Sequence, residues 1–213
     1  MKFGKWLDNF WYHHKWKTII IVFLVAVITV CAVQLIEKEE YDACVMYVGD
    51  ASISGTQYQD ILTSMRALCE DFSGDGKTVV NFSRLKYITD EKDPFYSETN
   101  ASAKEHLASM VVMPYYIYIM PTKLYDVYKG SGVFQPLDEI FTDGKIPGEI
   151  YDGSAIYFDS TYFAKNCAGG EGFAEDTVIA LKVVPYNHSK RAAAKEQKLR
   201  DANAELFKNI VGN

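Results

Sequence analysis

The chain is poor in the residues that build metal and redox sites. It holds four His and four Cys among 213 residues. His13 and His14 stand side by side in a basic N-terminal segment, whereas His106 and His188 lack a Cys, His or carboxylate at ligand spacing. Because a zinc site needs three or four such ligands, the sequence predicts no metal site.

Cysteine is also too sparse for a disulfide framework. Beyond residue 36 the cysteines are Cys44, Cys69 and Cys167, an odd number without regular spacing. Cys44 falls in a strand-like run and Cys69 on an expected helix, which favours buried free thiols. A bridge between Cys44 and Cys69 is the alternative that the sequence leaves open.

Familiar catalytic patterns are missing. The stretch "SGDGKT" (73–78) has Asp71 where a phosphate loop needs its first glycine, and a strand-like run follows it instead of a helix. No serine stands in a Gly-x-Ser-x-Gly elbow. We therefore expect neither an enzyme nor a bound cofactor. Four acids that could pair across a cleft are better interpreted as a solvated hairpin tip: Asp159, Glu171, Glu175 and Asp176.

What the sequence does contain is one long apolar run. Residues 18–36 are nineteen positions without a charge, enough for a helix of about 28 Å, close to the hydrocarbon thickness of a bilayer. The preceding segment, 1–17, holds four lysines against one aspartate, together with all three tryptophans. This lysine excess predicts a cytoplasmic N-terminus and an anchor at 18–36 that passes once through the cell membrane.

Cleavage of this run is the alternative. Val30-Cys31-Ala32 is a weak match to a signal-peptidase site, and Val30 stands where a lipoprotein signal needs a small residue. The long, tryptophan-rich segment ahead of the run favours an uncleaved anchor. We therefore expect residues 41–213 to form a domain outside the cytoplasm.

The charge of this domain excludes some partners. Residues 1–36 hold four of the 22 basic and one of the 28 acidic residues, so the remainder carries 18 against 27, a net charge of −9. A surface of this sign repels nucleic acid and anionic lipid. The size, in turn, suits one ordinary domain with its own core.

Hydrophobic periodicity predicts an α/β fold with a mixed sheet, in the order β-α-β-α-β-α-β-β-α. A capping box at Ser54/Gln57 or Thr56/Gln59 is expected to start the first helix, Asn100 to cap the second and Ser189 the last. The Gly-rich stretch 166–175 is expected to join the last two strands as a hairpin. The strands are expected at 43–48, 78–88, 114–121, 154–165 and 176–185, and the helices at 58–72, 101–109, 122–129 and after 189. The last helix is expected to carry an apolar face of Leu199, Ala202, Leu206 and Ile210.

One segment resembles a known family. In "YYIYIMPTKLYDVYKGSGVFQPLDEIF" (115–141) a strand, a short helix, Gly132 and then Pro136-Leu137-Asp138 follow one another. This pattern resembles a segment of the type 2 extracellular solute-binding proteins of ABC importers. The resemblance implies that 41–213 is similar to one lobe of such a protein, without the second lobe that would complete a clamshell.

The loop after the first strand is the best candidate for a binding site. In open α/β sheets ligands gather outside the carboxyl ends of the strands, and a Gly/Ser loop entering a helix offers free amides. A sugar or an oxyanion would suit this crevice. The alternative is that Ser54 or Thr56 simply caps its helix. The candidate residues are Gly49, Asp50, Ser52, Ser54, Gly55 and Thr56, with Pro121 and Thr122 from the end of the third strand.

A protein partner is the main functional expectation. The tyrosine-rich stretch 115–128 and the Gly-rich loop 168–173 could supply an interface, unless these tyrosines are covered sheet residues. A single lobe encloses only half of a small ligand, whereas membrane tethering favours association with a neighbouring protein. We therefore expect a membrane-anchored interaction or accessory domain that binds another protein or a second copy of itself, with small-solute binding as the alternative.

Overall fold

The chain folds into two compact units, Met1–Glu40 and Tyr41–Asn213. The computed structural model describes residues 3–36, 41–183 and 190–212. The expected cap at Ser189 and the end of the strand expected at 176–185 lie partly or wholly outside these residues.

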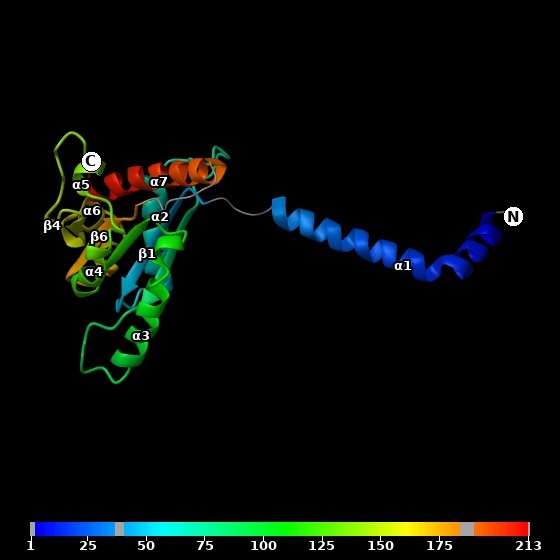
Figure 1. Ribbon diagram of the computed structural model, residues 1–213, viewed down its shortest axis with the longest axis horizontal. Helices are drawn as coiled ribbons and strands as arrows, with labels where there is room; N and C mark the ends of the chain where they lie inside the picture. The colour runs from blue at the N-terminus through cyan, green and yellow to red at the C-terminus, as the bar shows by residue number, and fades with distance from the viewer. Residues whose placement is uncertain (1–2, 37–40, 184–189, 213) are drawn as a thin grey trace. The chain divides into compact units, whose positions relative to one another are not determined.

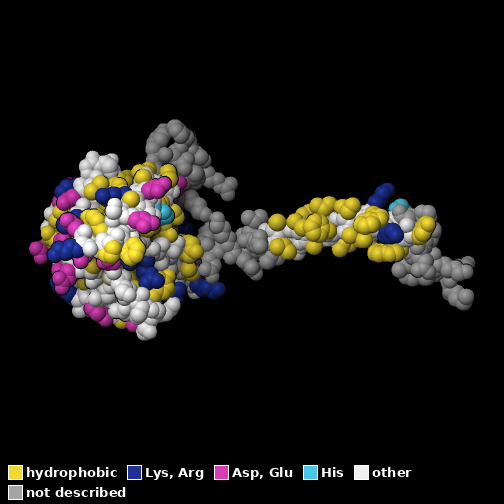
Figure 2. Space-filling view, turned by 90° about the horizontal axis from the view of Figure 1, so that it is seen from below, with side chains coloured by type: hydrophobic (Ala, Val, Ile, Leu, Met, Phe, Trp, Pro, Cys, Tyr) yellow, Lys and Arg dark blue, Asp and Glu magenta, His cyan; other side chains and the backbone are white. Residues whose placement is uncertain are grey.

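The first unit is a single helix, α1 (Phe3–Ile36). Within the described part of the chain, it is the one helix that is long and apolar enough to cross a membrane, through the 19 residues His14–Ala32. Apolar side chains cover much of its length, and lysines lie toward its N-terminal part (Figure 2). A helix of this kind suits either an anchor or a signal sequence.

The second unit is an α/β domain built on one mixed sheet (Figure 1). Short 3₁₀ turns, η1 to η4, lie at Met110–Val112, Lys129–Ser131, Phe158–Ser160 and Gly170–Gly172. The strands are β1 (Ala43–Gly49), β2 (Val80–Lys86), β3 (Ile117–Pro121), β4 (Ile150–Asp152), β5 (Ala155–Tyr157) and β6 (Thr177–Leu181). The helices are α2 (Gly55–Leu68), α3 (Tyr96–Leu107), α4 (Thr122–Tyr128), α5 (Leu137–Ile140), α6 (Tyr162–Asn166) and α7 (Lys190–Val211).

Within the described residues, six strands are ordered β2-β1-β3-β6-β5-β4. Strands β2 and β3 both pair with β1 in parallel, while β6, β5 and β4 are added antiparallel. The chain steps from β1 to β2 in one direction and from β2 to β3 in the other. Since parallel crossovers are right-handed, α2 and α3 must lie on opposite faces of the sheet. The predicted mixed α/β fold is confirmed at this level.

Alternating side chains of the central strands feed two separate cores. Val45 and Tyr47 of β1 pack with α2, α5, α6 and α7 on one face, whereas Met46 and Val48 pack with α3 and α4 on the other. All seven residues of β1 are buried, as its continuous apolar run predicts. Helix α7 contributes Leu206 and Ile210 to the first core, and Ala202 is buried as well, which confirms the predicted apolar face of the last helix.

The capping prediction for the first helix is confirmed in one of its two forms. Ser54 is the N-cap of α2: its hydroxyl accepts a hydrogen bond from Gln57 N at 3.3 Å, and its own N–H donates to Gln57 Oε1 at 2.9 Å. The helix ends at Leu68, before the expected position 72.

The predicted start of the second helix is wrong. Helix α3 begins at Tyr96, so Asn100 lies inside it, buried, and does not cap it. The Asn100 amide instead pairs with both backbone groups of Ile88, with donor–acceptor distances of 2.9 Å each. Asn100 therefore holds α3 against the end of β2, a tertiary role with no local sequence signal.

The long strand expected at 154–165 is also wrong. Only β5 is extended there; a 3₁₀ turn and helix α6 follow, with Thr161 Oγ1 accepting from Ala164 N at 3.2 Å as the cap. Strand β5 does pair antiparallel with β6, as expected, and it also pairs with β4, which the sequence did not predict.

Candidate binding hollow at the strand ends

An open hollow of about 340 Å³ lies where β1 and β2 end. We call it the strand-end hollow. Gly49, Asp50 and Ser52, three residues predicted for the site, line one side of it. The other side comes from β2, because the two strands pair in parallel and their carboxyl ends meet at one edge of the sheet. The complete lining is Tyr47, Gly49, Asp50, Ala51, Ser52, Arg84, Leu85 and Lys86.

Tyr47 forms the floor of the strand-end hollow. Its ring is fully buried, and its hydroxyl accepts long hydrogen bonds of 3.4 Å from Ala51 N and Ala174 N. Burial raises the pKa of this phenol above its ordinary value, so the hydroxyl keeps its proton at neutral pH. A Cβ at Gly49 would collide with the Tyr47 phenol, so only glycine fits beside it.

Arg84 and Lys86 give the hollow two cationic side chains opposite Asp50. Arg84 Nη1 donates to Ile53 O at 2.7 Å, and its guanidinium lies 5.2 Å from the ring centroid of Tyr58. These contacts tie β2 to the loop between β1 and α2 through Ile53, and to α2 itself through Tyr58. Lys86 is exposed. The sequence contains these cations in "FSRLKY", but only the parallel pairing of β1 with β2 brings them to the site.

The other predicted site residues do not line the hollow. Ser54 caps α2, and Gly55 and Thr56 form its exposed first turn. Pro121 and Thr122 lie at the carboxyl end of β3, as expected, but both are buried. The Thr122 hydroxyl donates to Asp176 Oδ2 at 2.7 Å, and its N–H to Asp176 O at 3.0 Å.

The segment before β6 bridges the carboxyl ends of β1 and β3, because Ala174 N donates to the Tyr47 hydroxyl and Asp176 binds Thr122. In the same segment the Phe173 ring lies edge-on to Tyr47 at 5.0 Å and 4.5 Å from the ring of Phe158 (centroid distances). Gly169 and Gly170 are buried against α2 and α6, where a Cβ would meet Ile61 or the backbone of α6. The middle of the Gly-rich stretch is therefore buried in the core, and only part of the stretch is exposed to solvent.

The tyrosine-rich stretch is mostly interior. Tyr118 is fully buried in β3, which confirms the covered-sheet interpretation for this residue. Tyr116, just before β3, and Tyr125, on helix α4, are also buried. Tyr125 donates its hydroxyl proton to Asp152 Oδ1 at 2.9 Å. Together with the buried glycines, this removes most of the interface expected at 115–128 and 168–173.

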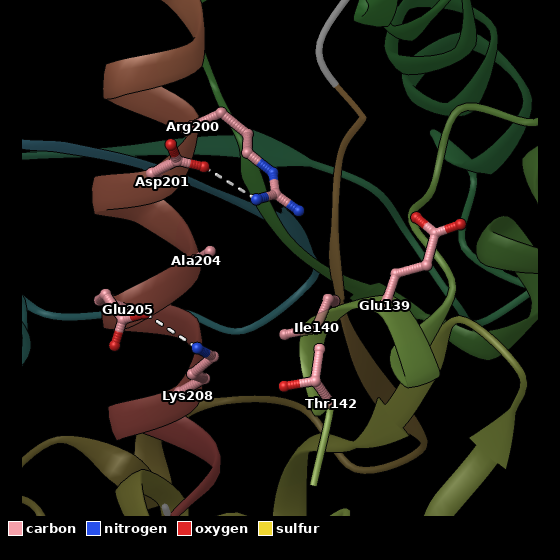
Figure 3. Close-up of a pocket in the computed structure, with 8 residues that line it drawn as sticks. All are labelled: Glu139, Ile140, Thr142, Arg200, Asp201, Ala204, Glu205 and Lys208. Carbon is pink, nitrogen blue, oxygen red and sulfur yellow. Dashed lines mark hydrogen bonds and ion pairs between the residues drawn. The ribbon is translucent and has the colours of Figure 1, made fainter. Parts of the chain in front are cut away.

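A second hollow, of about 200 Å³, lies between α5 and α7 (Figure 3). Its charged side chains already have partners in the protein. Arg200 pairs with Asp201 at 2.9 Å and also donates to the amide oxygen of Gln135, while Lys208 pairs with Glu205 at 2.8 Å. Both ion pairs lie within α7, and the contact with Gln135 joins α7 to the segment just before α5. Because these charges are already satisfied, the strand-end hollow is the stronger candidate site.

Lys182 is buried at the opposite, amino-terminal edge of the sheet, with 1% of its surface exposed. Its ammonium donates to Met110 O at 3.1 Å, Val111 O at 3.4 Å and Met113 O, and lies 4.9 Å from the ring centroid of Tyr116. Burial lowers the pKa of Lys182 to about 8, although the nearby Glu196 carboxylate acts in the opposite direction.

The cysteines of the domain are free thiols, Cys44 and Cys69 buried and Cys167 partly so. The structure therefore has the free thiols that the sequence favours and not the Cys44–Cys69 bridge. Burial raises the pKa of Cys44 and of Cys69 to about 12, so both stay protonated at neutral pH. Neither has the lowered pKa of a reactive thiol.

No protein-family model matches the chain, and neither the curated proteins nor the solved structures contain a match to it.

Proposed function

We propose that this protein is a membrane-tethered, extracytoplasmic interaction domain that binds a protein partner at the strand-end hollow. The apolar helix α1 supplies the tether, with residues 1–17 in the cytoplasm and 41–213 outside. The lysine excess before the apolar run supports this orientation. The domain acts by binding and carries out no chemical reaction of its own.

The observation that carries the proposal is the segment before β6, which bridges the carboxyl ends of β1 and β3 through Ala174 and Asp176. A small solute needs a concave site that covers most of its surface. Here Phe173 and the Thr122–Asp176 pair occupy the place where an α/β sheet of this order offers such enclosure. What remains is an open, mixed-charge surface, which suits the polar part of a protein interface better than a solute.

The likeness to one lobe of a solute-binding protein belongs to this proposal. It is supported by the mixed α/β sheet and by the order of β3, α4, Gly132 and α5 along 115–141. Gly132 has a φ of 69° at the end of the second 3₁₀ turn, a left-handed conformation that suits glycine. A lobe that has lost its partner lobe would keep the fold and present its strand ends to another protein.

A small polar solute is the second candidate ligand. The Tyr47 hydroxyl accepts in both of its hydrogen bonds, so its proton is left to donate into the hollow. With Lys86 on one side and Asp50 on the other, the hollow offers both donors and an acceptor to a sugar or an oxyanion.

Site-directed crosslinking in intact membranes tests the proposal. Ser52 and Lys86 are both exposed and line opposite sides of the hollow, so each is replaced by cysteine in a Cys31→Ser, Cys167→Ser background. Thr122 and Gly170, from the strand end and the Gly-rich loop expected at the interface, are unsuitable positions for a crosslinking cysteine. Thr122 is buried, and Gly170 has no room for a side chain. Both Ser52→Cys and Lys86→Cys should trap the same partner band.

The control is Lys198→Cys on the exposed side of α7, which should trap no such band. If Ser52→Cys and Lys86→Cys trap nothing, while the purified full chain binds a sugar or an oxyanion with a micromolar dissociation constant, the solute-binding candidate replaces the proposal.

A further inference from the structure

The most exposed apolar pair of the described domain lies on a short turn at the amino-terminal edge of the sheet. We call Met110–Met113 the 110–113 turn. Val111 is 49% and Val112 80% exposed, while Met110 is buried beneath them. Single exposed apolar residues are common on soluble proteins, whereas Val111 and Val112 adjoin one another and form a small apolar patch.

The 110–113 turn is held in a fixed shape. Val112 N and Met113 N both donate to Ser109 O, at 3.0 and 3.2 Å. From below, the Lys182 ammonium binds three carbonyls of the turn. Burying a charge is costly unless it is well bonded. Here the buried Lys182 ammonium is bonded by the carbonyls of the turn, and it fixes the turn so that Val111 and Val112 point outward.

The turn lies at the edge where the chain enters the domain. Tyr116 N, just after the turn, donates to Cys44 O at 3.1 Å, and Lys182 N donates to Tyr116 O at 2.7 Å. Tyr41, the first described residue of the domain, is 45% exposed. The strand-end hollow lies at the other end of β1, about 23 Å away for seven residues at about 3.3 Å each.

The tether limits what can cover this edge. Only residues 37–40 separate α1 from Tyr41, and a fully extended chain gains at most about 3.5 Å per residue. In a domain tethered through α1, Tyr41 therefore stays within about 17 Å of the last helical residue. The bilayer surface is therefore always close to this edge. A soluble partner, by contrast, would have to diffuse to it.

The chemistry of the turn also suits lipid. Residues 107–122 contain no charged side chain, and Tyr115 follows the turn as an amphipathic residue of the kind that favours the membrane interface. Because the net charge beyond residue 36 is −9, attraction to anionic lipid cannot drive the contact. The surface that fits is a zwitterionic lipid interface.

We infer that the 110–113 turn inserts Val111 and Val112 into the outer surface of the bilayer, which orients the strand-end hollow away from the membrane. This inference rests on the proposed function, because it needs α1 as the tether. It identifies a second contact surface, distinct from the hollow, whose partner is lipid.

Depth-dependent fluorescence quenching tests the inference on the full chain. The protein is reconstituted at less than one molecule per vesicle into phosphatidylcholine vesicles, in the Cys31→Ser, Cys167→Ser background. An environment-sensitive fluorophore is attached at Val112→Cys or, as the matched control, at Ser52→Cys. We expect lipid-borne nitroxide to quench the label at 112 at least threefold more than the label at 52, and iodide in the water to show the opposite preference.

Equal quenching at 112 and 52 by either quencher would overturn the inference. A label at 112 that is shielded from iodide but not quenched by lipid nitroxide would also overturn it, in favour of a protein occupant. A label on native Cys31, with only Cys167 replaced, distinguishes failure of the lipid contact at the 110–113 turn from failure of the α1 tether. If Cys31 is quenched by lipid nitroxide and 112 is not, only the inference fails; if Cys31 is accessible to iodide, the tether and the proposed function fail with it.

Discussion

Replacing Lys182 with methionine tests whether its buried charge stabilises the domain. Methionine keeps most of the aliphatic chain but removes the ammonium, which leaves Met110 O and Met113 O without their donor. A buried carbonyl that loses its partner costs about 1–3 kcal/mol. Relief of the desolvation of the ammonium offsets part of this loss. We therefore expect Lys182→Met to lower the free energy of unfolding by about 2–4 kcal/mol.

The pH dependence of this difference has a definite sign. The pKa of Lys182 is about 8 in the folded protein and about 10.4 in an unfolded chain. Between these values the unfolded state binds more protons, so the contribution of Lys182 to stability rises with pH across that window. The difference between wild type and Lys182→Met should therefore grow by about 2 kcal/mol from pH 7.5 to 9.5.

Urea unfolding of the detergent-solubilised full chain measures both quantities. All three tryptophans lie in residues 1–17, so the near-ultraviolet circular dichroism of tyrosine should be followed for the domain. Lys145→Met, at an exposed position, is the control and should change stability by less than about 0.5 kcal/mol. A Lys182→Met protein that is as stable as the wild type, with no growth of the difference above pH 8, would refute the reasoning.

Two further substitutions test packing at the strand-end hollow, each by the same urea assay. Gly49→Ala should cost about 1–3 kcal/mol, because its Cβ would collide with the buried Tyr47 phenol. Gly55→Ala, with open space around it, should be neutral or stabilising by up to about 1 kcal/mol; equal effects would contradict the collision. Ser54→Ala should cost about 1 kcal/mol through the lost capping box, and Thr56→Ala less than about 0.5 kcal/mol. A larger loss of stability for Thr56→Ala than for Ser54→Ala would mean that Thr56, and not Ser54, caps α2.

The elements that the sequence predicts well are those with a local cause. The buried run 43–48 forms β1, the Ser54–Gln57 box starts α2, and the apolar stripe of the last helix packs into the core. Each of these signals is complete within about a dozen residues. Neither pairing partners nor distant contacts are needed to recognise it.

The two main errors have different causes, a tertiary contact in one case and a local helix cap in the other. Asn100 looks like a cap because asparagine caps helices often, but its amide binds the backbone of Ile88, just after β2. The run 154–165 is rich in aromatic residues that favour strands, yet Thr161 starts a helix there. Aromatic propensity for strands is weak and is overridden by packing.

The candidate site was predictable in part for the same reason. Gly49, Asp50 and Ser52 follow a recognisable buried strand, and a loop at that place in an α/β sheet is a standard candidate. Arg84 and Lys86 join them only through the pairing of β1 with β2, which no local pattern specifies. The burial of Thr122 likewise depends on Asp176, which is 54 residues away in the sequence.

The reactivity of one cysteine in intact cells tests the tethered, extracytoplasmic domain most directly. Ser52 is exposed at the strand-end hollow, and Asp8 lies in the segment proposed to be cytoplasmic. Each is replaced by cysteine in the Cys31→Ser, Cys167→Ser background and treated with a membrane-impermeant maleimide. We predict that Ser52→Cys is labelled in intact cells and Asp8→Cys only after lysis. Labelling of Asp8→Cys in intact cells, with Ser52→Cys protected until lysis, would contradict the proposed topology and the function built on it.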